Sequence, residues 1–243
     1  MRRAPDETLL EYQSIYGEKE GKSVYLITNA TSQLFREWRV FLYFFAGNKE
    51  RVDALNASSG SSTRIIQKAL WDSAILKIRR LTDPAKQKSN NNLSLEQLVR
   101  IADRACDIDL TQLHDAIDDK VSSCNKHADK YLAHSDLPHA HGTKVAPVTR
   151  QETTEAVVAI GDFVRLFHQK TRQVDYALMP IGGSNDEKQF LMHLFLGHQK
   201  DTANRKERLE KAKSGAPFEG TDHDWPEWIF NKSTNDLFKP FET

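Results

Sequence analysis

Apolar residues recur at helical spacing through most of this 243-residue chain, and this periodicity constrains the fold more than any other feature. In residues 110–134, six apolar or small side chains follow one another at intervals of three or four positions. They are Leu113, Ile117, Val121, Cys124, Ala128 and Tyr131. An α-helix completes a turn about every 3.6 residues, so this spacing places all six on one face. Strand-like alternation is rare and only 11 glycines and 8 prolines interrupt the pattern, so we expect an all-α bundle.

Further apolar stripes indicate the helices that surround this one. They predict helices over about 30–46, 62–82, 94–105, 150–178 and 184–213. Thr31 or Ser32 is the expected N-cap of the first, and Ser94 that of the third. The second is expected to pack through a face that includes Ile65 and Ile66.

The sequence Met-Pro-Ile-Gly-Gly at 179–183 is the strongest internal break, because proline and glycine both interrupt helices. We therefore predict three parts. Residues 1–29 form an N-terminal helical or irregular segment, 30–180 a helical bundle, and 181–243 a C-terminal helix with a tail that contains tryptophan.

Composition narrows the functional class. Lysine and arginine balance aspartate and glutamate at 34 each, which argues against a protein that coats nucleic acid generally. Two cysteines, Cys106 and Cys124, cannot form a disulfide framework or a four-cysteine zinc site, so we expect a reduced, cytoplasmic setting. The N-terminus does not have the pattern of a signal peptide, and the longest apolar run, 40–46, is too short to cross a bilayer.

Residues 124–136 carry the side chains most suited to chemistry. Within a helix, His127, Lys130 and His134 lie within about 60° of one another, beside the apolar stripe. Histidine transfers protons near neutral pH, and a neighbouring cation holds a phosphate and stabilises developing charge. This combination suits metal-independent RNA cleavage, in which the 2′-hydroxyl attacks the neighbouring phosphate. The alternative is that these residues form the polar rim of a packing helix, with His134 near a C-terminus that favours cations.

Three segments together resemble the HEPN superfamily, in particular the branch related to the abortive-infection U-type proteins of bacteria. They are Leu70–Pro84, with Trp71-Asp72 and Arg79-Arg80 inside it, Asn92–Leu95, and Asp129–Asp136. The resemblance covers about residues 30–175. It implies an HEPN-like helical bundle, a homodimer, and an RNase site where two motif helices meet; the helical C-terminal extension beyond about residue 180 is expected from the sequence pattern and is not covered by the resemblance.

The family motif is an arginine, a polar residue, a few further residues and a histidine. Carried over, the polar residue is Asp129 and the histidine is His134, but Ala128 stands at the arginine position. Either Lys130, Lys126 or His127 replaces the arginine, or the chain is an inactive HEPN module for dimerisation, RNA binding or protein binding. In the active reading His134 is the general acid and base, Lys130 the phosphate-side cation and Asp129 the orienting group.

Charge adds candidates for RNA binding. Residues 62–88 contain seven basic and two acidic side chains, including Arg79 and Arg80, whereas 101–120 contain six aspartates and two basic residues. The basic segment is either an RNA surface or the packing partner of the acidic one.

The basic stretch 200–213 and the tail favour a third hypothesis for the function, in which this extension binds a partner protein or nucleic acid. His139 and His141 follow His134 closely, but they lie in a loop past Pro138 with no carboxylate or thiolate closer than Asp136, so we predict no metal and no cofactor. RNA and a cognate antitoxin or defence protein are the expected partners.

Overall fold

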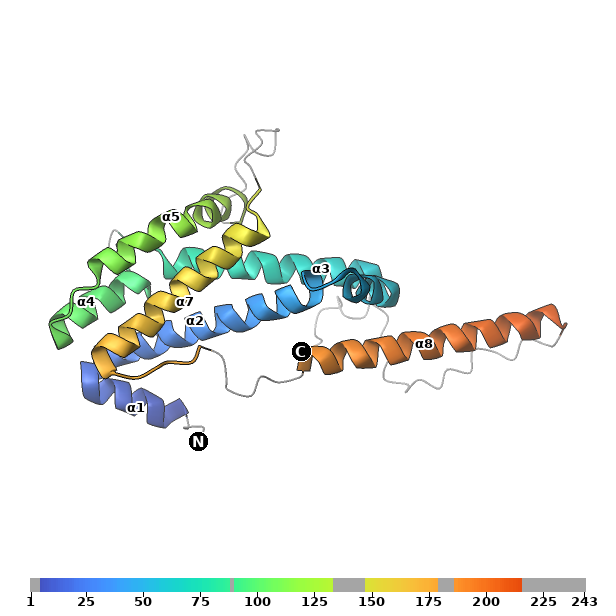
Figure 1. Cartoon of the computed structure of the whole chain (residues 1–243), viewed down its shortest axis with the longest axis horizontal. Coiled ribbons are helices and arrows are strands. Elements are labelled where there is room, and N and C mark those ends of the chain that lie inside the picture. Colours follow the sequence, from blue (N-terminus) through green and yellow to red (C-terminus); the bar gives the residue numbers. More distant parts are fainter. Residues whose placement is uncertain (1–4, 88–89, 133–146, 179–185, 216–243) are drawn as a thin grey trace, which may run out of the picture. The chain divides into compact units, whose positions relative to one another are not determined.

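A computed structural model describes residues 5–87, 90–132, 147–178 and 186–215, and its helices confirm the all-α prediction (Figure 1). The helices are α1 (Pro5–Tyr16), α2 (Glu18–Phe45), α3 (Lys49–Leu81), α4 (Leu95–Cys106), α5 (Thr111–His127), the π-helix η1 (Ala128–Leu132), α7 (Arg150–Arg172) and α8 (Asp186–Lys213). A short antiparallel hairpin joins α3 to α4 through β1 (Lys86–Gln87) and β2 (Asn90–Asn91). The chain divides into two units, Met1–Phe195 and Leu196–Thr243, and the division falls within α8.

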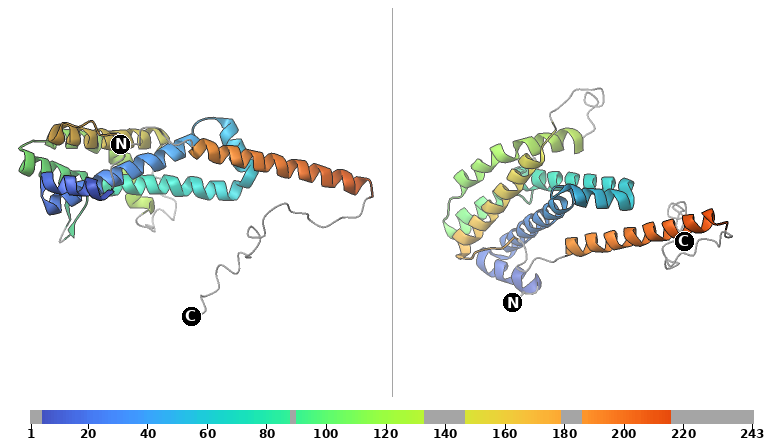
Figure 2. Two further views of the ribbon diagram at one scale, coloured as in Figure 1. Left: turned by 90° about the horizontal axis from the view of Figure 1, so that it is seen from below. Right: turned by 45° about the vertical axis from the view of Figure 1, so that its right-hand side comes forward.

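The first unit is organised around α2, α3, α5 and α7, which lie side by side in both views of Figure 2. Leu34 of α2, Ile75 of α3 and Ile160 of α7 are fully buried in one continuous apolar cluster. α4 contributes a narrow apolar face to the same cluster, and α1 packs against the N-terminal half of α2. This arrangement fixes α5, and therefore the segment with the candidate chemistry, between α3 and α7.

The apolar stripe of 110–134 is confirmed in its centre. Ile117, Val121, Cys124 and Ala128 are buried, whereas Leu113 and Tyr131 at the two ends are each 39% exposed. The regular helix ends at His127, and the next five residues form η1, a helix with wider turns. π-turns of this kind are rare and occur often at functional sites. His134 lies outside the described residues.

The helix at 30–46 begins much earlier than predicted. α2 starts at Glu18, and the expected caps Thr31 and Ser32 lie inside it. Thr31 is buried, and its hydroxyl donates to the Ile27 carbonyl one turn earlier, 3.0 Å away. The β-branched side chains before residue 30 pack against the core, and this packing outweighs their weaker helix propensity.

The close pairing of α1 and α2 explains that early start. Gly17 has a φ of 91° and reverses the chain between the helices, a conformation that glycine adopts without strain. At Gly21 a Cβ atom would lie 2.5 Å from backbone atoms of Gln13, so only glycine permits this approach. Residues 18–29 are therefore part of a continuous helix with residues 30–45.

α3 also differs from its predicted limits. It starts at Lys49 and contains a break at Ser59, where the backbone is not helical. Ile65 and Ile66 are 69% and 47% exposed, so the prediction that both belong to the packed face is wrong. Periodicity identifies an apolar face but does not specify where along a helix a neighbour covers it.

One of the buried polar side chains is a histidine. His168 of α7 is fully buried, its ring stacks on Tyr12 and Tyr176, and its Nε2 is 3.0 Å from the Thr28 hydroxyl. Burial lowers the pKa of His168 to about 3, and the cation of Arg172 acts in the same direction. The imidazole is therefore neutral at physiological pH and forms part of the packing between α1 and α7.

The N-terminal ends of α7 and α4 differ in whether the capping side chain forms a hydrogen bond. Thr149 caps α7 with a reciprocal capping box, in which its hydroxyl accepts from the Glu152 amide at 3.1 Å and Glu152 bonds back to the Thr149 amide at 2.7 Å. Ser94 stands at the N-cap of α4 as predicted, but its buried hydroxyl makes no bond within the described residues. No described helix is long and apolar enough to cross a membrane.

Candidate functional site

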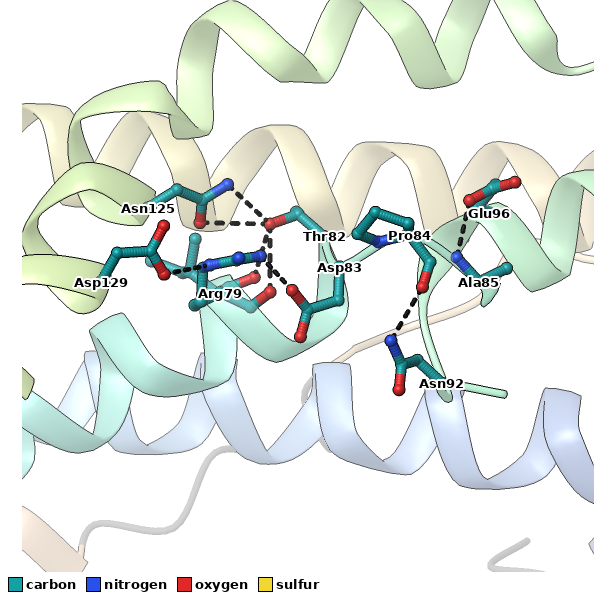
Figure 3. A network of polar contacts seen from close by, with 10 residues as sticks. Arg79, Thr82, Asp83, Pro84, Ala85, Asn92, Glu96, Asn125 and Asp129 are labelled. Carbon is teal, nitrogen blue, oxygen red and sulfur yellow. Dashed lines mark hydrogen bonds and ion pairs between the residues drawn. The ribbon is translucent and has the colours of Figure 1, made fainter. Parts of the chain in front are cut away.

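The end of α3 meets the end of α5 and η1 along a polar contact that we call the α3–α5 seam, defined by Arg79, Thr82, Asp83, Asn125 and Asp129 (Figure 3). Arg79 Nε donates to Asp129 Oδ1 at 2.7 Å, and Arg79 Nη1 forms an ion pair with Asp83. The Asn125 amide nitrogen lies 3.0 Å from the Thr82 hydroxyl. The seam therefore joins the basic segment of the sequence to the segment that carries the family motif.

Helical spacing on each side creates this seam. Thr82 and Asp83 follow Arg79 by three and four positions; Arg79 lies in the last turn of α3, Thr82 is the C-cap and Asp83 comes directly after it, so the three side chains lie at the same helix end. Asn125 and Asp129 are four positions apart and share a face on α5 and η1. The sequence prediction included Arg79 and Asp129 but omitted the other three, although the Asn125–Asp129 spacing was a usable signal.

The chain after α3 is held in place by bonds to the first turn of α4 and to the segment before it. Pro84 follows Asp83 and cannot continue the helix. The Ala85 amide donates to Glu96 Oε2 at 2.6 Å, and the Asn92 side-chain amide donates to the Pro84 carbonyl at 2.9 Å. The Ala85 bond lowers the pKa of Glu96, which keeps this carboxylate charged. These contacts fix the position of Asp83 beside Arg79.

His127 lies on the side of α5 that faces the middle of α3. Burial lowers its pKa, the carboxylate of Asp72 raises it, and the cation of Lys68 lowers it. Lys68 and Asp72 form an ion pair with each other, and the His127 ring lies 4.8 Å from the ring of Tyr131. The predicted RNA-binding residue His127 is thus partly buried and less basic than a free histidine.

Ala128 belongs to the apolar core, with no exposed surface. An arginine at this position would enter the core rather than the seam. Asp129 and Lys130, which follow it, are exposed, and Lys126 is exposed one turn earlier. Among the described residues, neither lysine forms an ion pair, in contrast to Asp129. The structure therefore brings Asp129 to Arg79, and the relation of both to His134 stays a prediction.

The basic segment does not pack against the acidic one through ion pairs. Within the described part of residues 62–88, Lys68 pairs with Asp72, Lys77 with Glu37, and Arg79 with Asp83 and Asp129. No ion pair joins the described part of this segment to residues 101–120, so direct pairing does not support the alternative in which the two segments neutralise each other. Arg80 is exposed and has no ion-pair partner among them.

Two other regions offer less chemistry. In α8, Arg205 pairs with Asp201 and Lys213 with Glu210, so local carboxylates offset part of its positive charge. A cavity of about 340 Å³ between α2, α3 and the first turns of α8 has an apolar lining that includes Phe44, Leu55 and Phe190, without a titratable group. No cluster of potential metal ligands occurs in the described parts of the chain, and His139 and His141 lie outside them.

The family model for AbiU2, an HEPN family, matches residues 21–179, which include all five residues of the seam. The chain belongs to the AbiU2 family. Its HEPN bundle begins within α2 and ends after α7, and it excludes α8. No curated protein and no solved structure matches the chain. This AbiU2 chain is therefore an HEPN-type protein related to abortive infection, a class whose domains commonly dimerise.

Proposed function

We propose that this AbiU2 protein is an RNA-directed component of a bacterial phage-defence or toxin–antitoxin system, and that it acts in the cytoplasm as a homodimer. One observation carries the proposal. The guanidinium of Arg79, which belongs to the basic segment and lies on α3, contacts Asp129 of η1, the polar residue of the family motif, at 2.7 Å. Arg80, which follows Arg79 in the sequence, and Lys126 and Lys130, which flank Asp129 in the sequence, are exposed and add positive charge to these two segments.

The proposed reaction is metal-independent cleavage of RNA. His134 of one protomer removes the proton of a ribose 2′-hydroxyl, whose oxygen attacks the adjacent phosphorus. The bond from phosphorus to the 5′-oxygen breaks, and His134 of the partner subunit protonates that oxygen. The products are a 2′,3′-cyclic phosphate and a 5′-hydroxyl end. Lys130 stabilises charge on the phosphate, and Asp129 orients the cation beside it. Lys126, His127, Arg79 and Arg80 bind neighbouring phosphates.

An RNase assay in EDTA tests this proposal, with total RNA and tRNA as substrates. We expect cleavage by the natural protein and a loss of about 100-fold or more in His134→Ala, since positioned acid–base groups contribute factors of about this size. His193→Ala removes an exposed histidine of α8 and serves as the matched control. Equal cleavage by His134→Ala, or cleavage that EDTA abolishes, would contradict the proposal.

A second function is favoured by the burial of Ala128. A site without the motif arginine is compatible with an HEPN module that dimerises and binds RNA or a partner protein without cutting. This function predicts a stable dimer by light scattering and no RNase activity under any of the conditions above. A monomeric protein would count against both functions, because each uses the dimer.

A further inference from the structure

The first turns of α8 carry apolar side chains on every side. Residues 190–195 read Phe-Leu-Met-His-Leu-Phe, and a segment of this length completes more than one and a half helical turns. One side faces the bundle, where the ring of Phe190 lies 5.3 Å from that of Phe44 and Glu187 forms a 2.6 Å ion pair with Arg39. A helix that is apolar all round is normally buried all round. We therefore expect the other sides of this segment to contact a partner.

α3 presents a second uncovered apolar segment beside the same part of α8. The cavity of about 340 Å³ is lined by Leu55 and Ile66 of α3 and by Phe190 and Leu194 of α8. Ile66 and Phe190 are 47% and 48% exposed, so the cavity is open to solvent. Ile65, next to Ile66, is 69% exposed, more than any other large apolar side chain in the described residues. We define the α3–α8 apolar surface as Ile65, Ile66, Phe190, Met192 and Phe195.

The area of the α3–α8 apolar surface matches the requirement of a stable dimer. Met192 and Phe195 are each 50% exposed. With about 200 Å² for a fully exposed side chain of this size, the five residues together expose about 500 Å² of apolar area. A stable interface buries about 800 Å² on each partner, of which somewhat more than half is apolar. Exposed apolar patches of several hundred Å² on a protein surface mark interaction sites.

We infer that two copies of this chain meet through the α3–α8 apolar surface, with apolar side chains of each copy entering the cavity of the other. This inference rests on the homodimer of the proposed function and names the surface that forms it. A two-fold interface uses the same patch on both copies, so the patch must contain projecting side chains as well as space that receives them. The α3–α8 apolar surface has both features, because Ile65 projects into solvent next to the open cavity.

The position of this surface on α3 favours a second copy over an unrelated partner. Lys68 and Asp72, whose charges act on His127 of α5, follow Ile65 by three and seven positions. These separations correspond to about 5 and 10 Å along the helix axis. Two copies joined through Ile65 therefore have the C-terminal ends of both α5 helices near the interface. A site shared by two protomers requires this proximity.

Analytical ultracentrifugation of the full-length protein measures the dissociation constant of the dimer. We expect Ile65→Glu and Phe195→Glu each to weaken the dimer about 100-fold or more, because each copy then brings a carboxylate into the apolar contact. Leu10→Glu and Leu209→Glu are the matched controls, since these leucines are 65% and 55% exposed and lie outside the α3–α8 apolar surface. The controls should change the dissociation constant less than about 3-fold. Circular dichroism verifies that each variant is folded.

The possible results separate this inference from the proposed function. If the natural protein is a dimer and the Ile65 and Phe195 variants associate as tightly as the controls, the inference is wrong and the homodimer remains. If the natural protein is a monomer at high micromolar concentration, both are wrong. Native mass spectrometry that finds a monomer carrying a small apolar molecule would assign the cavity to a ligand and would also overturn the inference. Neither measurement uses RNA, so an absence of RNase activity would contradict the proposed reaction without affecting this test.

Discussion

Restoring the motif arginine by Ala128→Arg should destabilise the protein rather than activate it. Ala128 has no exposed surface and lies in the cluster that contains Ile117, Val121 and Cys124. An unpaired buried charge costs about 3–5 kcal/mol, and overpacking a filled core costs about 1–3 kcal/mol more. The sum, about 4–8 kcal/mol, is comparable with the whole stability of many domains. We therefore expect the melting temperature to fall by roughly 10 °C or more.

Circular dichroism at several temperatures measures this effect, with two controls. Lys130→Arg introduces the same side chain at an exposed position of η1 and should change the free energy of unfolding by less than about 0.5 kcal/mol. Ala128→Leu adds volume without charge and should cost about 1–3 kcal/mol. A stable Ala128→Arg variant that gains RNase activity would refute this reasoning and show that the natural site has lost an arginine.

Three further predictions concern stability. The pKa of His168 is about 3 in the folded protein, so the native state stays unprotonated while the unfolded chain binds a proton below about pH 6.5. Its contribution to stability is complete above pH 6.5 and is lost between pH 6.5 and 3. In the natural protein the free energy of unfolding should decrease as the pH falls below 6. His168→Gln should make this decrease less steep by up to about 1.4 kcal/mol per pH unit. The same pH dependence in both proteins would contradict the prediction. Thr149→Ala should lower the free energy of unfolding by about 1 kcal/mol in urea denaturation, because it removes a capping box. Ser94→Ala should not lower it, because the Ser94 hydroxyl has no hydrogen-bond partner among the described residues. Equal losses in the two variants would contradict this prediction. Gly161→Ala should destabilise the protein because its Cβ would overlap the ring of Phe35, and a melting temperature equal to that of the natural protein would exclude this clash.

The sequence predicted the fold class and the central stripe of α5 because both depend on local periodicity. Ile117, Val121 and Cys124 repeat at helical spacing, and a buried face follows directly from that pattern. Helix limits were less accessible. The start of α2 depends on the close approach at Gly21, which is a contact between two helices.

The sequence identified Arg79 and Asp129 of the seam as candidates, but it did not predict that they pair, and their functional roles stay predictions. Arg79 and Asp129 are 50 positions apart in the sequence, and their contact depends on the rotation of α3 relative to α5. No local pattern encodes that rotation. Nor does a local pattern predict η1, in which Ala128 is buried while the next residue, Asp129, contacts α3. The role of His134 and the domain limits at 30 and 180 stay predictions.

Whether RNA binds at the α3–α5 seam is tested most directly by photo-cross-linking, with 4-thiouridine placed in a 2′-O-methyl RNA and bound to the full-length protein. Mass spectrometry then identifies the linked peptides. We expect cross-links in residues 79–87 and 126–134, and their loss in Arg79→Ala under the same conditions. Cross-links confined to α8, or none at protein concentrations in the micromolar range, would contradict an RNA-directed function for this seam.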